Sequence, residues 1–185
     1  MRKLIMWNLV TLDGFFEGAK PWDLDWHNEV WGEELEQFSL EQAQTADTLL
    51  FGRLTYQGMV AYWTNATGDI ADFMNSVTKV VASRTLAKAE WNNTRLINTD
   101  IEAEVLTLKQ QPGKNILIFG SANLCATLMP TGLIDEYRLC IVPVVLGNGT
   151  PLFKSLPELL KLNLLKTRTL KSGGIILYYI SGGRH

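Results

Sequence analysis

The segment ADTLLFGRLTYQGM (residues 46–59) joins an apolar strand to a helix through three residues of distinct chemistry. The run TLLF (48–51) is typical of a buried strand and stops at Gly52, after which Arg53 and Thr55 precede a stretch of helical character. A glycine, a guanidinium and a hydroxyl at such a junction form either a tight turn that happens to carry an arginine, or an anion-binding site. The other strand ends of the sequence favour the anion-binding site.

Strand and helix patterns alternate along the whole chain. Predicted strands cover residues 2–10, 47–51, 78–82, 95–97, 115–119 and 138–147, and predicted helices cover 32–45, 54–63, 70–76, 101–110 and 121–129. This alternation predicts an α/β fold with a mostly parallel sheet that is covered on both faces. Residues 162–180 read as an antiparallel hairpin turning at 171–174, which we expect to add an antiparallel edge strand.

The composition predicts one globular domain over residues 1–185. The chain is 46% hydrophobic and carries a formal net charge of −2, so it offers no basic excess for a nucleic acid or an anionic membrane. No apolar stretch approaches the roughly 20 residues of a membrane-spanning helix. The basic and apolar start (residues 1–14) is interpreted as a first strand and not as a signal peptide, and we expect a cytoplasmic protein with Cys125 and Cys140 as buried thiols.

Three predicted strands end in residues that suit an anion. Gly52-Arg53 follows the first of them, Ser83-Arg84 follows the second, and Gly120-Ser121 precedes a predicted helix after the third. Because ligands of open α/β sheets bind at the carboxyl ends of strands, the three ends together favour a ligand with several phosphates, such as a dinucleotide. The common G-x-G-x-x-G fingerprint is missing, so a different architecture is expected.

The ordered motifs resemble one superfamily. The sequences TLDG (11–14), GRLTY (52–56), SRTL (83–86), IFGSANL (118–124) and LIDEYRLCIVPVVLGNGTPLF (133–153) are similar to the dihydrofolate reductase superfamily. The resemblance is closest to the branch of the reductase domain of the bacterial riboflavin-biosynthesis deaminase-reductase, and it covers essentially the whole chain. It implies a three-layer α/β/α fold, a mixed and mostly parallel sheet, NADPH as cofactor and a homodimer.

The same resemblance assigns the cofactor site residue by residue. It implies that Gly52, Arg53 and Thr55 lie along the NADPH phosphates, and that the pyrophosphate is capped by Gly120, Ser121, Ala122 and Asn123. It also implies that Ser83 and Arg84 hold the adenosine 2′-phosphate. Since the nearest acid that follows in the sequence is Glu90, we expect NADPH to be preferred over NADH.

The aromatic stretch 15–31 is predicted to close over the ligand, with Trp22 and Trp26 stacking on a flat heterocycle. Titratable candidates for proton transfer are Asp13, Asp25, His27, Glu33 and Glu34, of which Asp13 and His27 are put forward as catalytic. Asp13 serves equally well as part of an Asp-Gly turn, and a lone histidine is often a packed side chain. By resemblance, Gly147 and Asn148 border the substrate pocket, and no metal site is expected.

The sequence therefore predicts an NADPH-dependent oxidoreductase that transfers a hydride to a small pterin- or pyrimidine-like heterocycle. Riboflavin-type reduction stays open, because neither a matched cluster for a sugar phosphate nor a deaminase domain was found. The alternative is a non-catalytic sensor that binds NADP(H) or another nucleotide and lacks a working proton donor. In both cases the expected partners are a small molecule and a second copy of the chain.

Overall fold

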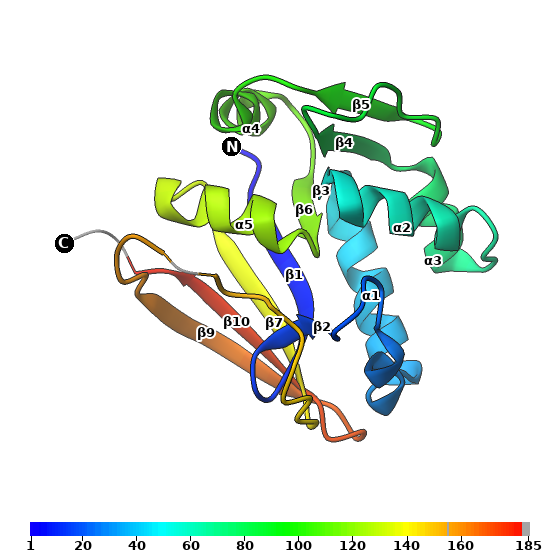
Figure 1. Cartoon of the computed structure of the whole chain (residues 1–185), viewed down its shortest axis with the longest axis vertical. Helices are drawn as coiled ribbons and strands as arrows, with labels where there is room; N and C mark the ends of the chain where they lie inside the picture. Colours follow the sequence, from blue (N-terminus) through cyan, green and yellow to red (C-terminus); the bar gives the residue numbers. More distant parts are fainter. Residues whose placement is uncertain (155, 183–185) are drawn as a thin grey trace.

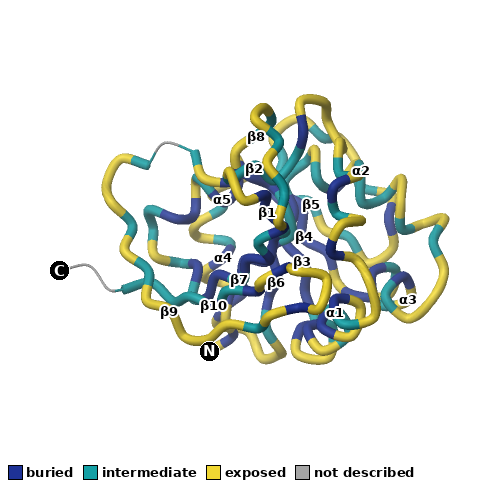
Figure 2. The backbone as a smooth tube through the Cα atoms, turned by 90° about the horizontal axis from the view of Figure 1, so that it is seen from below, coloured by how far each residue is buried: buried dark blue, intermediate teal, exposed yellow. Residues whose placement is uncertain are grey.

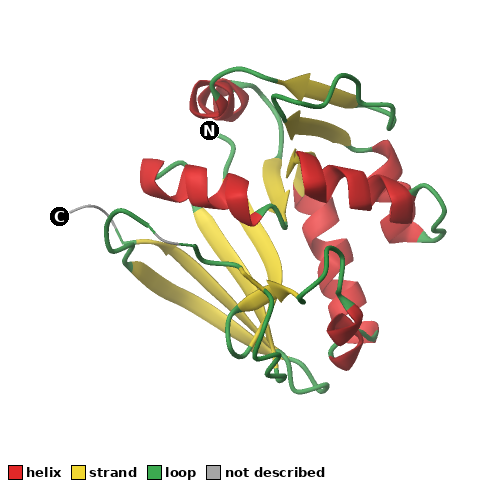
Figure 3. Cartoon of the chain, in the orientation of Figure 1, coloured by secondary structure: helices red, strands yellow, loops and turns green. Residues whose placement is uncertain are grey.

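The computed structural model describes residues 1–154 and 156–182. Its main sheet has eight strands in the order β5-β4-β3-β6-β1-β7-β10-β9, and helices cover both faces (Figures 1 and 3). The strands are β1 (Leu4–Thr11), β3 (Ala46–Gly52), β4 (Thr78–Ala82), β5 (Thr94–Ile97), β6 (Asn115–Phe119), β7 (Glu136–Val142), β9 (Leu162–Thr169) and β10 (Ile175–Ser181). The α-helices are α1 (Glu33–Thr45), α2 (Arg53–Trp63), α3 (Asp69–Ser76), α4 (Ile101–Gln110) and α5 (Ala122–Leu128).

The predicted mixed sheet is confirmed, with one difference at its edge. All strand pairs of the sheet are parallel except the two made by β10, which runs antiparallel to both β7 and β9. The antiparallel strand is therefore one position inside the sheet, and the edge strand β9 runs parallel to the rest. The hairpin has this arrangement because its second strand, β10, is the one that pairs with β7.

Three short elements, two strands and a 3-10 helix, were not predicted. β2 (Phe15–Glu17) pairs with β8 (Thr150–Pro151) in a separate antiparallel sheet, and Asp25–Glu29 forms a 3-10 helix within the aromatic stretch. The strand expected over 138–147 ends at Val142. Pro143 has no N–H for the sheet, and the chain then turns so that Leu12 donates its N–H to the Val144 carbonyl (2.9 Å).

Side chains alternate between two packed faces of the central strands. On one face Leu4, Met6 and Val10 of β1 join a core with α4 and α5. On the other face Ile5 packs toward α2 and α3, and Trp7 packs with Phe38 of α1. The central strands are buried accordingly, whereas β9 is exposed over most of its length (Figure 2).

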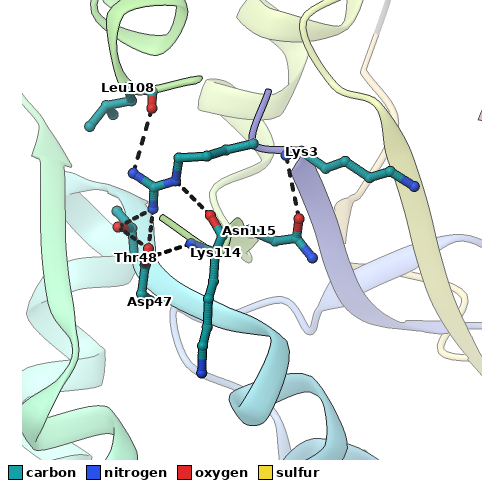
Figure 4. A network of polar contacts seen from close by, with 7 residues as sticks. Lys3, Asp47, Thr48, Leu108, Lys114 and Asn115 are labelled. Atoms are coloured by element: carbon teal, nitrogen blue, oxygen red, sulfur yellow. Dashed lines mark hydrogen bonds and ion pairs between the residues drawn. The ribbon is translucent and has the colours of Figure 1, made fainter. Parts of the chain in front are cut away.

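Arg2 links the amino ends of three strands of the sheet. Its buried guanidinium donates to the Asp47 carboxylate and to Thr48 Oγ1 (2.7 Å) at the start of β3, and its Nε donates to the Lys114 carbonyl (2.6 Å) just before β6 (Figure 4). A further contact reaches the Leu108 carbonyl of α4. The amino ends of β1, β3 and β6 are thus held together by side-chain contacts, and the opposite edge is left free for a site.

Lys79 ties β4 to the end of α3. The side chain is fully buried, and its Nζ donates to the Met74 and Val77 carbonyls (2.8 Å each) and approaches the Asn75 carbonyl (3.3 Å). It also lies over the Trp91 ring, with Nζ 4.4 Å from the centroid. A cation at the carbonyl end of a helix satisfies acceptors that the helix itself leaves unpaired.

We predict that Lys79→Met lowers the free energy of unfolding by about 2 kcal/mol or more, because buried carbonyls lose their donor. Exposed Lys88→Met is the matched control and should change it by roughly 0.5 kcal/mol at most. Burial lowers the pKa of Lys79 to about 8 from its ordinary 10.5. Between these pH values the unfolded chain binds more protons, so wild-type stability should rise with pH relative to Lys79→Met in denaturant titrations. Equal stability of the two proteins across this range would contradict the assignment.

Candidate functional site

The carboxyl ends of five neighbouring strands, β5, β4, β3, β6 and β1, open into one large cleft. Its volume is about 1430 Å3, above the few hundred cubic ångströms of an ordinary ligand pocket. The residues that follow β4, β3 and β6 line it together with Trp7, Asn8 and Leu9 of β1. The structure brings all nine predicted cofactor residues to this cleft, namely Gly52, Arg53, Thr55, Ser83, Arg84, Gly120, Ser121, Ala122 and Asn123.

Two of the junctions contact each other through one hydroxyl group. Ser121 Oγ accepts the Gly52 N–H and donates to Thr55 Oγ1, with both distances 2.8 Å. Gly120 and Ser121 are both in the left-handed region, with φ of 58° and 59°, which turns the chain sharply from β6 into α5. A Cβ on Gly120 would lie 3.1 Å from Thr55 Cγ2, so a side chain there would crowd the junction.

Two guanidinium groups line the cleft without a carboxylate partner among the described residues. Arg53 lies at the start of α2, and its Nη1 donates to Gln57 Oε1 (3.3 Å). Arg84 follows β4 and is exposed. Next to it, Ser83 Oγ accepts the N–H groups of Thr85 (3.2 Å) and Leu86 (2.9 Å), which holds the turn and leaves the hydroxyl proton free to donate.

An acid lies at the same end of the cleft, contrary to the expectation from the sequence. Asp100 follows β5, which pairs with β4, and it lines the cleft together with Arg84. Its Oδ1 accepts the N–H groups of Glu102 and Ala103 as the N-cap of α4. Glu90 is the nearest following acid in the sequence, but β5 pairs with β4 and brings the more distant Asp100 close to Arg84.

Aromatic side chains form a further wall of the cleft. Phe16, Trp22 and Trp31 come from the stretch 15–31 and face the cleft. Trp22 is held in place by its backbone, because its N–H donates to Glu17 Oε2 (2.8 Å), and by its indole, which occupies the space that a Gly58 side chain would fill. We call residues 18–24 the strap, since they run from β2 to this contact with α2.

His27 lines the cleft, but its charge state differs from the expectation. Burial lowers the pKa of the imidazole to about 4, so His27 is neutral at pH 7 and holds no proton as an imidazolium. Its Nε2 is buried without a hydrogen-bond partner among the described residues, and its ring packs edge-on against Trp26 (4.4 Å between centroids). A neutral histidine can still form a hydrogen bond to a ligand.

Four predicted site residues lie away from the cleft. Asp13 is exposed and accepts hydrogen bonds from Thr11 Oγ1 (2.6 Å) and the N–H groups of Leu146 and Gly147, which lower its pKa and favour the turn role over catalysis. Trp26 is 8% exposed and belongs to the core beneath α1. Gly147 and Asn148 lie in the loop that Asp13 holds, and neither lines the cleft.

The other acids proposed for proton transfer also lie outside the cleft. Asp25 and Glu33 are exposed, and Glu34 Oε2 accepts the Lys171 N–H (2.6 Å). Sequence reasoning instead missed Glu17 and Lys154, which do line the cleft. Glu17 stands in β2, a strand too short to be seen in the pattern, and Lys154 contacts Asn123 from a distant loop. No periodicity in the sequence would have found either residue.

In residues 1–154 and 156–182, no three His, Cys, Asp or Glu side chains gather closely enough to hold a metal ion. Within the same ranges no helix is long and apolar enough to cross a membrane.

Comparisons with known proteins agree with this geometry. The RibD C-terminal domain family matches residues 2–176. Protein YyaP of Bacillus subtilis, which is itself uncharacterized, is 35% identical and covers 98% of this chain and 96% of its own length. YwjB of the same organism is 32% identical over 90% of this chain and 91% of its own.

Solved structures share the fold at low sequence identity. A putative riboflavin biosynthesis protein of Shewanella sp. PV-4 has a TM-score of 0.82 at 21% identity, covering 98% and 99% of the two chains. Dihydrofolate reductase of Enterococcus faecalis has a TM-score of 0.66 at 15% identity, covering 98% and 97%. RibD of Acinetobacter baumannii matches with 0.70 at 16% identity over 98% of this chain and 58% of its own. The chain belongs to the RibD C-terminal domain family and has a dihydrofolate reductase-like fold.

Proposed function

We propose that this chain is an NADPH-dependent reductase of a small pyrimidine- or pterin-like heterocycle. The observation that carries the proposal is the meeting of the β3, β4 and β6 junctions in one cleft, with two guanidinium groups that have no carboxylate partner among the described residues. Family membership supports it, as does the likeness to a dihydrofolate reductase solved with NADP(H). Reduction of the riboflavin-pathway type is one activity within this proposal.

The order of the strands supports one arrangement of the cofactor along the cleft. Arg84 and Ser83 after β4 would hold the 2′-phosphate, because a guanidinium and a hydroxyl can donate to the same phosphate. Arg53 and Thr55, with the segment Gly120–Asn123, would hold the pyrophosphate between β3 and β6. No side chain caps the first turn of α2 or of α5, so their backbone N–H groups stay available. The nicotinamide would then reach β1.

The aromatic wall suits a flat substrate. When bound, NADPH would supply the hydride, and the chain would supply alignment and exclusion of water. Trp22 and Trp31 offer ring faces, and Gln42 and Ser39 of α1 add polar groups to the same wall. Neutral His27 would orient the heterocycle by a hydrogen bond.

The absence of a free acid on this wall favours a second candidate function. Among the described residues, Glu17 and Asp100 are the carboxylates that line the cleft, and Asp100 lies at the opposite end. Both oxygens of Glu17 are engaged, with the Trp22 N–H (2.8 Å) and the Thr150 hydroxyl (3.3 Å). A protein that binds NADP(H) without turnover, as a sensor, fits this arrangement. Oxidation of NADPH followed against a panel of pteridines and pyrimidines separates the two, since turnover of any member excludes a binding-only role.

We predict that Arg84→Ala weakens NADPH binding about ten- to a hundredfold and leaves NADH nearly unchanged, because the cofactors differ only in the 2′-phosphate. Asp100→Asn is the complementary variant, since asparagine is an equally good N-cap and only the charge is lost. It should strengthen NADPH binding roughly two- to fivefold. Fluorescence titration with both cofactors measures these affinities. Equal weakening of NADPH and NADH by Arg84→Ala would place Arg84 outside the 2′-phosphate site.

We also predict that Gly58→Leu detaches the strap. The leucine side chain would occupy the position of the Trp22 indole, while helix α2 itself gains propensity from the loss of a glycine. Chymotryptic cleavage after Trp22, followed by mass spectrometry, should accelerate about tenfold. Ala61→Leu, on the exposed face of the same helix, is the control and should cut at the wild-type rate. An unchanged rate in Gly58→Leu would show that this contact does not hold the strap.

Finally, we propose that two chains pair through the terminal hairpin. Leu164 and Leu165 of the edge strand β9 are each 53% exposed, and an edge strand has unpaired backbone groups. Light scattering at micromolar concentration should give the mass of two chains, and the double variant Leu164→Lys, Leu165→Lys should give the mass of one. A single-chain mass for the wild type would disprove the dimer.

A further inference from the structure

Asn8 carries a buried amide group that is only half satisfied. The residue is 6% exposed, and its Oδ1 accepts the N–H of Gly120 (2.8 Å) at the end of the neighbouring strand β6. Because a backbone N–H requires an acceptor, this contact identifies which arm of the amide is the oxygen. The other arm, Nδ2, is shielded from solvent and has no hydrogen-bond partner among the described residues.

An unpartnered buried donor needs an explanation, since most such groups are met by protein, ligand or solvent. Asn8 lines the cleft, whereas Met6 and Val10 on the same face of β1 belong to the apolar core. The amide thus stands where that core ends and the cleft begins. A ligand that fills the cleft is the group best placed to supply the missing acceptor.

The position of Asn8 along the cleft indicates which part of a ligand it meets. In the proposed function, on which this step rests, the 2′-phosphate lies after β4 and the pyrophosphate between β3 and β6. The next strand in the sheet is β1, so the nicotinamide half lies over it. Of the β1 residues that line the cleft, Trp7 and Leu9 offer mainly apolar surface, and Asn8 offers an amide donor.

We propose that Asn8 binds the nicotinamide half of the cofactor, with Nδ2 donating to the carboxamide oxygen while Oδ1 stays on Gly120 N–H. One side chain would then connect the placement of the hydride donor to the junction that holds the pyrophosphate. The contact also explains a polar residue on a face of β1 that is otherwise apolar.

Asn8→Asp tests the contact, because aspartate has the same shape, retains an oxygen for Gly120 N–H and replaces the donor by an acceptor. Two ligands are titrated, NADPH and 2′-phospho-ADP-ribose, which lacks only the nicotinamide. The variant should bind NADPH about tenfold more weakly and the fragment within about twofold of wild type. Asn75→Asp is the matched control. Asn75 is a half-buried amide outside the cleft whose Nδ2 donates to the Trp63 and Ala71 carbonyls, so its loss should lower thermal stability and leave both affinities unchanged.

A measurement on the wild type supports the test if the variant does not fold. The thionicotinamide analogue of NADPH presents a weaker acceptor, and wild type should bind it about tenfold more weakly than NADPH. Equal affinities for these two cofactors, or an equal loss of NADPH and fragment in Asn8→Asp, would overturn the role of Asn8. Wild type that binds none of the three ligands would instead disprove the proposed cofactor itself.

Discussion

The geometry of the cleft depends on two hydrogen bonds of the Ser121 hydroxyl. It accepts the Gly52 N–H and donates to Thr55, so the β3–α2 and β6–α5 junctions are joined by one atom. The contact requires Ser121 to adopt a left-handed backbone conformation, which costs free energy in a residue with a Cβ. Strain of this kind is stored where the surrounding structure needs a fixed position. The hydrogen bonds of Ser121 thus fix the β3–α2 and β6–α5 turns relative to each other.

The amino ends and the carboxyl ends of the strands differ in how their arginines are paired. At the amino ends, Arg2 is buried with the Asp47 carboxylate and with backbone and hydroxyl acceptors, so its charge is compensated within the fold. At the carboxyl ends, Arg53 and Arg84 have no such carboxylate among the described residues. A guanidinium without a carboxylate partner keeps most of its donors for a ligand. The arginines at the carboxyl edge therefore remain available to an anion, whereas Arg2 at the amino edge does not.

The cleft has charged groups of both signs at one end and an aromatic wall at the other. Arg84 favours a phosphate at the end of β4, and Asp100 at the end of β5 repels one. At the other end, the aromatic wall favours a flat ring, and the low pKa of His27 keeps its imidazole uncharged at pH 7. The strap packs on α2 in this half because Gly58 leaves room for the Trp22 indole. The groups that a ligand in the cleft would meet thus come from different elements of the fold.

The sequence by itself determined the α/β class, the main strands and helices, and the three strand–helix junctions that meet in the cleft. It could do so because burial, helix entry and anion-binding residues leave local patterns that extend over only a few positions. The same local reading explains the misplaced end of β7, since IVPVV remains apolar after Pro143 has left the sheet. Only the tertiary structure decided which candidates share a cavity. It placed Trp26 in the core and Asp13 in a turn, and it brought Glu17, Lys154, Asp100 and Asn8 to the cleft. Those positions depend on which strands lie side by side in the sheet, and the spacing of residues along the sequence does not reveal the strand order.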